Sequence, residues 1–244
     1  MSTEAKAEIA PPAARRKRAS AKAACAGTQD TKEHILEVAE RMFADRGFAS
    51  VSIRDLTAEA GVNIASINYY YGSKDKLLYE VFRRRVTEMT DARISGLRAA
   101  EARAGGKPTP RDIFHALIAP AIEWRDPASN KASALKFLAR ARTEGTPQIK
   151  KVIDVRLGAL EEFRDALLRA VPGASIEDVC WGLHFALSTL HHVGVERARL
   201  GALSNGACDP SDTSMLLRRL VDFAAAGFME MAAAKAPAKA INQR

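Results

Sequence analysis

The sequence has little of what extracellular, membrane-embedded or metal-binding proteins need. Its three cysteines, Cys25, Cys180 and Cys208, are too few and too scattered for a disulfide framework. No apolar run approaches the roughly twenty residues that cross a bilayer. No stretch alternates polar and apolar residues as a strand does. These absences predict an all-α protein of the cytoplasm that makes no membrane contact.

Motifs for catalysis are also missing. There is no glycine-rich phosphate loop, no HExxH helix and no nucleophile motif. Cys180 and His184 are one helical turn apart, but His191 lies about 10.5 Å further along a helix, and two ligands do not make a metal site. We therefore expect no catalytic residue, no metal and no cofactor. An enzyme or a small-molecule carrier is kept as the alternative from another class.

The stretch from residue 52 to 72 divides into two short helices around a tight turn. Ser52 and Asp55 form a capping box that predicts a helix start at Ile53, and Gly61 is placed to end that helix. Asn63 can cap a second helix over residues 64–70. Two helices joined in this way match a DNA-binding helix-turn-helix, although a helical hairpin that merely packs has the same spacing.

The exposed face of the second helix favours DNA. A helix that only packed would usually expose Lys, Glu and Gln, whereas here the outward residues are small, hydroxylated, amide or aromatic. Asn can read adenine, small apolar groups contact the thymine methyl, and hydroxyl and ammonium groups contact phosphates. The predicted DNA-binding residues are Ser52, Ile64, Ala65, Ser66, Asn68, Tyr69, Tyr70 and Lys74.

Residues 31–82 resemble the N-terminal domain of the TetR family of transcriptional regulators. The resemblance rests on Arg46-Gly47-Phe48, Gly61-Val62-Asn63, Tyr69-Tyr70-Tyr71 and Gly72-Ser73-Lys74. It implies an all-α homodimer with a DNA-binding head and a ligand-binding body. It also implies a repressor that a small effector releases from palindromic, double-stranded operator DNA. The family often has Tyr where Asn68 stands, so the operator sequence that is read is expected to differ.

The chain divides into four parts by composition. Residues 1–30 are Ala-rich with a basic cluster, which predicts a disordered basic tail; an arm that adds phosphate or minor-groove contacts is compatible with it. Residues 31–82 form the helix-turn-helix domain. Residues 83–235 form the helical ligand-binding and dimerisation domain, and 236–244 form a C-terminal tail.

Cap residues and prolines punctuate the body. Helix four is expected from Ser73 to about Ala104, and three Thr-Pro or Asp-Pro pairs predict helices near 110–125, 127–144 and 147–171. Pro120 should kink the first of these. A capping box predicts a helix from Ser175 to about Leu203, and the last helix is expected over residues 213–235.

The body more loosely resembles fatty-acid-responsive regulators of the PsrA type, in Trp181–Leu187 and Phe223–Gly227. Residues 91–172 carry fifteen basic against ten acidic side chains, which suits an anionic effector such as a fatty acid or acyl thioester, or else a solvated positive face. A protein partner in place of the small effector is a further alternative. The predicted ligand-binding residues are Phe114, Trp124, Phe137, Arg140, Trp181, His184 and Phe185.

Two helices have apolar sectors wide enough for contacts on two sides. The helix from Ser175 and the last helix would form a four-helix bundle with their symmetry mates. The alternative is that both simply complete the core of a monomer. The predicted interface residues are Leu187, Leu190, Leu216, Leu220, Phe223 and Gly227.

Overall fold

The computed structural model describes residues 12–149, 158–193, 197–209 and 211–234, with backbone alone for residues 12–28. These ranges are helical and contain no strand, which confirms the all-α prediction. The elements are α1 (Pro12–Arg46), α2 (Ile53–Ala60), α3 (Ile64–Tyr71), α4 (Lys74–Arg103), α5 (Pro110–Glu123), the 3₁₀ turn η1 (Pro127–Ser129), α6 (Ala132–Glu144), α8 (Gly158–Ala170), α9 (Ile176–His192), α10 (Arg197–Leu203) and α11 (Thr213–Ala234). None of these described helices is long and apolar enough to cross a membrane.

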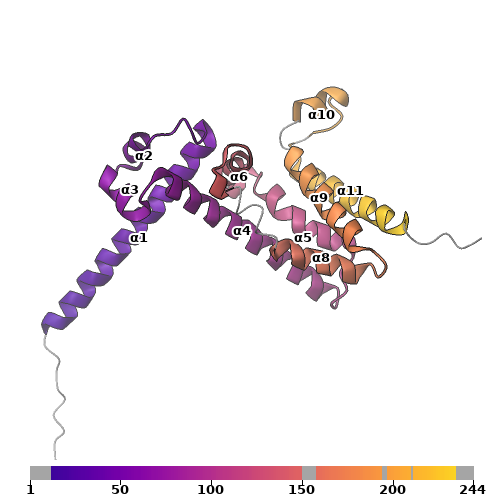
Figure 1. Cartoon of the computed structure of the whole chain (residues 1–244), viewed down its shortest axis with the longest axis horizontal. Coiled ribbons are helices and arrows are strands. Elements are labelled where there is room, and N and C mark those ends of the chain that lie inside the picture. Colours follow the sequence, from indigo (N-terminus) through magenta and orange to yellow (C-terminus); the bar gives the residue numbers. More distant parts are fainter. Residues whose placement is uncertain (1–11, 150–157, 194–196, 210, 235–244) are drawn as a thin grey trace, which may run out of the picture.

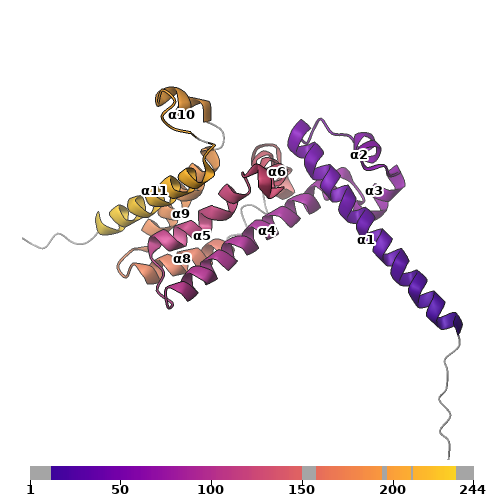
Figure 2. The same ribbon diagram turned by 180° about the vertical axis from the view of Figure 1, so that it is seen from behind.

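Helices α1, α2 and α3 form a head at one end of the molecule, and α4 runs from this head into the body (Figure 1). The body is built from α5, α8, α9 and α11 beside the C-terminal half of α4 (Figure 2). Helix α6 lies between the two parts and packs on α1 as well as on α4. A single long helix and α6 therefore connect the head to the body.

The caps that the sequence predicts are present. Ser52 with Asp55, Thr109 with Asp112 and Ser175 with Asp178 each form a reciprocal capping box. Each box satisfies two amides that a helix start leaves without partners, so these helices begin where local sequence places them.

Helix α1 starts at Pro12, well before the expected start near residue 31. The segment expected to be disordered is thus helical from Pro12 onward. Alanine, arginine and lysine are strong helix formers, and proline is favoured at a first helical position, so the segment extends the helix without needing a core of its own.

Two expected body helices are interrupted. Residues 127–144 divide into η1 and α6 because Asn130 adopts a left-handed conformation with φ of 55°, which ends the first turn. Helix α9 ends at His192, and a separate α10 covers part of the remaining span to Leu203. Most of the junction expected within 147–171 lies outside the described residues, which resume at α8.

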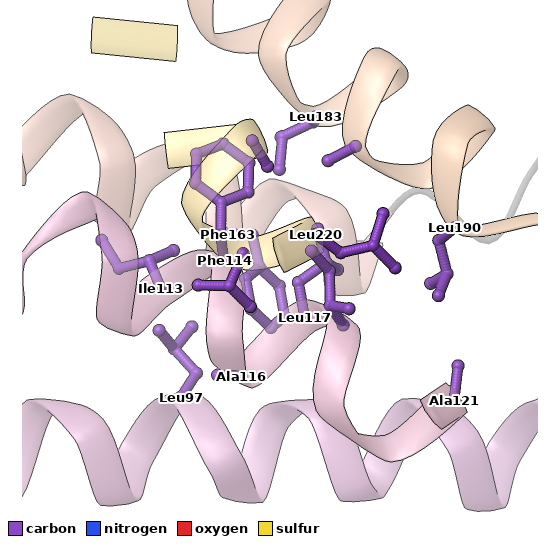
Figure 3. Packing of buried hydrophobic residues seen from close by; sticks show 14 of the residues in the cluster. Leu97, Ile113, Phe114, Ala116, Leu117, Ala121, Phe163, Leu183, Leu190 and Leu220 are labelled. Carbon is purple, nitrogen blue, oxygen red and sulfur yellow. The ribbon is translucent and has the colours of Figure 1, made fainter. Parts of the chain in front are cut away.

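The buried side chains form two cores. One fills the body, where Phe114 of α5 meets Phe228 of α11 with ring centroids 5.9 Å apart (Figure 3). The other fills the head, and it includes Phe137 and Ala141 of α6. Phe137 is fully buried, so the head completes its core with a side chain from outside the head.

We predict that Phe137→Ala lowers the free energy of unfolding by about 3–5 kcal/mol, because it leaves a cavity in the head core. Tyr69→Ala is the control, since Tyr69 is 80% exposed and its removal should change stability by less than about 0.5 kcal/mol. Urea denaturation of both variants measures the difference. Equal stability losses would show that Phe137 does not complete the head core.

Candidate nucleic-acid interface

Helices α2 and α3 are held at a fixed angle by the turn between them. Gly61 ends α2 at φ of 63°, a left-handed conformation that glycine adopts without strain. The Asn63 side chain caps α3 by accepting from the Ser66 amide at 2.8 Å. The Ser52 hydroxyl donates to the Asp55 carboxylate at 2.6 Å, and this bond lowers the pKa of Asp55. The helix-turn-helix geometry is therefore fixed by short-range contacts.

Helix α3 is anchored to the head from its inner face. Ile67 is fully buried, and the Tyr71 hydroxyl donates to the Lys32 carbonyl of α1 at 2.7 Å. Burial raises the pKa of Tyr71, so this phenol stays protonated and keeps donating at any pH that the fold survives. Anchoring the inner face leaves the outer face of α3 free to contact a partner.

The outer face carries most of the residues predicted to contact DNA. Ile64 is 45% exposed and Tyr69 is 80% exposed, and Ala65 and Asn68 are also exposed. Tyr70 is half-buried and packs edge-on against Tyr69, with ring centroids 5.1 Å apart. This arrangement puts one amide and two small apolar groups on a convex ridge flanked by phenols, which matches the chemistry of base edges and sugar-phosphate walls.

Three predicted DNA contacts are already engaged within the head. The Ser52 and Ser66 hydroxyls donate to Asp55 and Asn63, respectively. The Lys74 ammonium donates to the Phe48 carbonyl at 2.8 Å and the Val51 carbonyl at 2.9 Å. Lys74 thus fastens the loop between α1 and α2, which differs from the phosphate contact expected from sequence. The distant loop carbonyls decide this, and local sequence does not reveal them.

Two cations beside this ridge escaped the sequence interpretation. Arg54 in the first turn of α2 and Lys76 in the first turn of α4 are both exposed. Neither makes an ion pair with another residue of the described ranges. By contrast, Arg41 of α1 pairs with Glu59 at 2.5 Å. Both flank α3, where an approaching phosphate would meet them, and spacing from Asn68 is the signal that could have found them.

Helix α6 clamps the head by aromatic and polar contacts. The Phe137 ring lies 5.4 Å from that of Phe48, and the Arg140 Nε donates to the Ala44 carbonyl at 2.9 Å. Glu144 accepts from the Phe48 amide at 3.0 Å, which lowers the pKa of Glu144. Phe137 and Arg140 therefore belong to the junction of α6 with the head, which corrects their expected place in a cavity wall.

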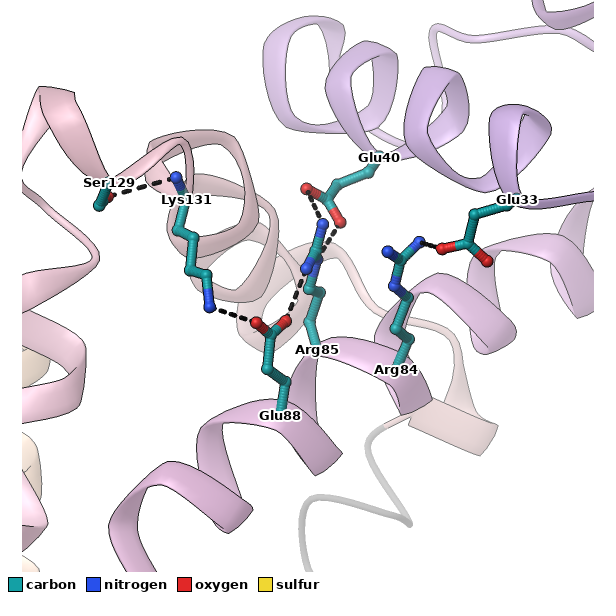
Figure 4. Close-up of polar contacts among 7 residues, drawn as sticks. All are labelled: Glu33, Glu40, Arg84, Arg85, Glu88, Ser129 and Lys131. Carbon is teal, nitrogen blue, oxygen red and sulfur yellow. Dashed lines mark hydrogen bonds and ion pairs between the residues drawn. The ribbon is translucent and has the colours of Figure 1, made fainter. Parts of the chain in front are cut away.

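A chain of ion pairs ties α1, α4 and the start of α6 together (Figure 4). Arg85 of α4 pairs with Glu40 of α1 and donates to Glu88 at 2.6 Å, and Glu88 also pairs with Lys131. Arg85 and Glu40 are largely buried, so breaking one member leaves a costly unpaired charge. The network makes the head, α4 and α6 move together.

The remaining predicted ligand residues do not gather around one cavity. Phe114 and Trp124 are packed inside the body core. Trp181 and Phe185 stack on each other at 5.2 Å on the outside of α9, each 48% exposed, and His184 is exposed beside them. The shared cavity expected from sequence is therefore not formed by these side chains, because the α9 sector that carries Trp181 faces away from the core.

Two hollows lie on the described surface. One of about 460 Å³ is lined by ends of α5 and α11 with η1, including Ile122, Ser129 and Leu217. The other, of about 390 Å³, lies over α9 and is lined by Glu177, Cys180, Trp181 and His184. No three His, Cys, Asp or Glu side chains converge within the described ranges.

The predicted interface residues fall into two groups. Leu190 and Leu220 are buried in the body core, and Leu187 and Leu216 pack against it. Phe223 is 66% exposed, and Gly227 has open space where a side chain would point. The first four thus contribute to the monomer core, and the last two stand on the outside of α11, available to a partner.

We predict that Lys74→Ala lowers the free energy of unfolding by about 1–3 kcal/mol, because two loop carbonyls lose their donor. Lys76→Ala, two residues away and exposed, should leave stability within about 0.5 kcal/mol of the parent. Thermal unfolding of both variants measures this. If Lys76→Ala were the more damaging change, the fastening role of Lys74 would be refuted.

Comparison with known proteins matches both parts of this architecture. The family profile of bacterial regulatory proteins of the tetR family matches residues 35–81, and that of the tetracyclin repressor-like C-terminal domain matches residues 115–227.

Individual relatives agree. The regulator BetI of Brucella anthropi is 29% identical over 152 residues, which cover 59% of this chain and 75% of BetI. The repressor KstR2 of Mycolicibacterium smegmatis is 35% identical over 52 residues, covering 21% of this chain and 25% of KstR2. This chain spans less than two thirds of the length of most curated relatives that it matches.

A solved structure shares the whole fold. The TetR family regulator PfmR of Thermus thermophilus superposes with a TM-score of 0.55 at 20% identity, covering 79% of this chain and 97% of PfmR. The head and body profiles, the helix-turn-helix geometry and this likeness lead to one conclusion: the chain belongs to the TetR family of transcriptional regulators.

Proposed function

We propose that this protein is a homodimeric repressor of the cytoplasm that binds a palindromic operator and leaves it when a small effector binds the body. The observation that carries the proposal is the outer face of α3, where Ala65 and Asn68 are exposed on a buried anchor. Its relatives are regulators, and catalysis is not part of the proposed function. The proposed division is a head over residues 31–82 and a body over residues 83–235.

In this proposal α3 enters the major groove. The Asn68 amide reads an adenine edge, and Ala65 contacts a thymine methyl. The Tyr69 and Tyr70 hydroxyls donate to phosphates, and Arg54 and Lys76 supply the positive charge that Lys74 spends on the loop. The net charge of +8 is spread over the chain, so local exposure carries this argument rather than bulk charge.

Two copies must present paired α3 helices to successive major grooves, about 34–36 Å apart. The exposed aromatic face of α9 and α11, including Trp181, Phe185 and Phe223, supplies a surface for a twofold interface. Gly227 and its neighbour Ala226 let a partner helix approach this surface closely. We therefore place the dimer interface there, on the outward residues of the two helices.

Release requires that the effector favour a state with a different spacing of the two heads. The route that supports this runs through α6, because Phe137, Arg140 and Glu144 clamp the head, and through α4, because Arg85 ties it to α1. Any shift of α6 against the body would be passed to the head by these contacts.

The test of the whole proposal is whether the purified full-length protein shifts DNA from the region beside its own gene in a gel assay. A repressor of this type shifts that DNA and an unrelated fragment of equal length does not compete. An enzyme or carrier would bind neither fragment specifically. Release of the DNA by a purified protein, and by no metabolite extract, would favour control by a protein partner.

We predict that Asn68→Ala weakens operator binding by about 1–3 kcal/mol and relaxes the preference at one base pair of each half-site. Lys76→Ala should weaken all DNA sequences alike and reduce the slope of log affinity against log salt by about 1. Fluorescence anisotropy with single-base operator variants at several salt concentrations measures both. A uniform loss for Asn68→Ala would remove it from base reading.

We predict that Phe223→Glu raises the dimer dissociation constant by about tenfold or more, since it buries a charge at the proposed interface. Leu203→Glu on α10 is the matched control, because Leu203 is 81% exposed and lies off this surface. Sedimentation velocity over a concentration series measures the change. A dimer insensitive to Phe223→Glu would place the interface elsewhere.

A further inference from the structure

Four cationic or potentially cationic side chains from four segments come together in the body. Arg93 lies on α4, Arg125 follows α5, Arg142 lies on α6 and His191 lies in the last turn of α9. All three arginines are close enough to lower the pKa of His191 electrostatically, and Arg142 likewise lowers that of Arg93. The cluster is distinct from the surface hollows and from the residues expected to bind ligand.

The polar contacts of this cluster include two to backbone carbonyls. Arg93 Nε donates to the Leu117 carbonyl at 2.9 Å, and Arg125 Nη2 donates to the Leu190 carbonyl at 3.3 Å. Within the described ranges neither Arg93 nor Arg142 makes an ion pair. This is unusual for α4, on which the other buried arginine, Arg85, pairs with two carboxylates.

Gathering these charges carries an energetic cost. Burial lowers the pKa of Arg93 to about 10 and also lowers the pKa of Arg142. Burial and the three arginines lower the pKa of His191 to about 3, so its ring is neutral at neutral pH. Cations withdrawn from water are normally paired. Repulsion between the gathered cations is what an anion would relieve.

We propose that Arg93, Arg125, Arg142 and His191 bind the carboxylate or phosphate group of a small molecule. This inference rests on the proposed function, for which it names the effector as an anion and moves its site away from Arg140 and His184. A guanidinium presents paired donors that match both carboxylate and phosphate oxygens, and the neutral imidazole has one N–H to add. Arg93 is too enclosed to be part of a merely solvated basic face.

The site also explains how binding reaches the head. Arg142 is on α6, next to Ala141, which packs in the head core, and two residues from Glu144, which holds the Phe48 amide. An anion shared by Arg93 and Arg142 joins α4 to α6 where the two now repel each other. The resulting movement of α6 is passed on by the clamp on the head.

The test measures anion binding by the full-length protein without DNA, using calorimetry and thermal unfolding at constant ionic strength. The probes are inorganic phosphate, dodecanoate and the neutral analogue dodecanol. We expect phosphate or dodecanoate to bind and to stabilise the parent, whereas dodecanol does neither. Arg142→Gln should weaken that binding about tenfold or more, because one charge-assisted contact is lost. Arg164→Gln, in which the lost partner is the adjacent Asp165, should not.

A second measurement locates the anion independently of stability. Addition of the bound probe should shift the NMR signals of the His191 ring and leave those of the exposed His115 unchanged. If Arg142→Gln fails to fold, Arg93→Gln takes its place.

Binding of neither anion, or equal affinity in Arg142→Gln and Arg164→Gln, overturns the site. Unchanged His191 signals on saturation do the same. Operator binding without added anion is measured separately on the same preparations. Its loss would refute the proposed function, whereas an intact operator complex with no anion binding refutes only this inference.

Discussion

The head of this protein cannot bury its own core without help from the body. Phe137 arrives from α6, lies against Phe43 and Phe48, and is fully buried. A side chain of this size stabilises the head by several kcal/mol through burial alone. Since the same helix also donates to the Ala44 carbonyl, the orientation of the head depends on where α6 sits. The fold thus makes a DNA-reading surface and a body helix into one mechanical unit.

Opposite the clamp, α6 carries a charge that no ion pair neutralises within the described part of the chain. Arg142 faces the Arg93 and His191 cluster, while Arg140 on the same helix is paired with Glu144 at 2.6 Å and bound to the head. One side of α6 is therefore satisfied and the other is not. A ligand can shift an equilibrium only by binding one state better than another, and a cluster of cations on a connecting helix is a place where that difference can arise.

The outer surfaces serve different partners. On α3 the exposed residues are small or carry an amide or phenol, which suits a polar groove, whereas on α9 and α11 the exposed residues are large and apolar, which suits a second protein surface. The stacked pair of Trp181 and Phe185 belongs to the second kind. Their large apolar surface led sequence reasoning to expect them in a ligand cavity, and only their direction on α9 distinguishes the two roles.

Local sequence was sufficient for the helices and for the face of α3. Ser52, Asn63 and Thr109 cap helices through hydrogen bonds that span three residues, so the fold of these segments is decided within one helical turn. The all-α class and the exposure of Asn68 follow from the same short-range periodicity.

The tertiary structure alone decided what the long side chains bind. Lys74 fastens a loop more than twenty residues away, Phe137 fills the head core, and Arg93 meets Arg142 from another helix. An amphipathic pattern shows which face is buried but not what it is buried against, and a flexible cation has several partners within reach. Those choices depend on contacts between residues distant in sequence, which no local pattern encodes.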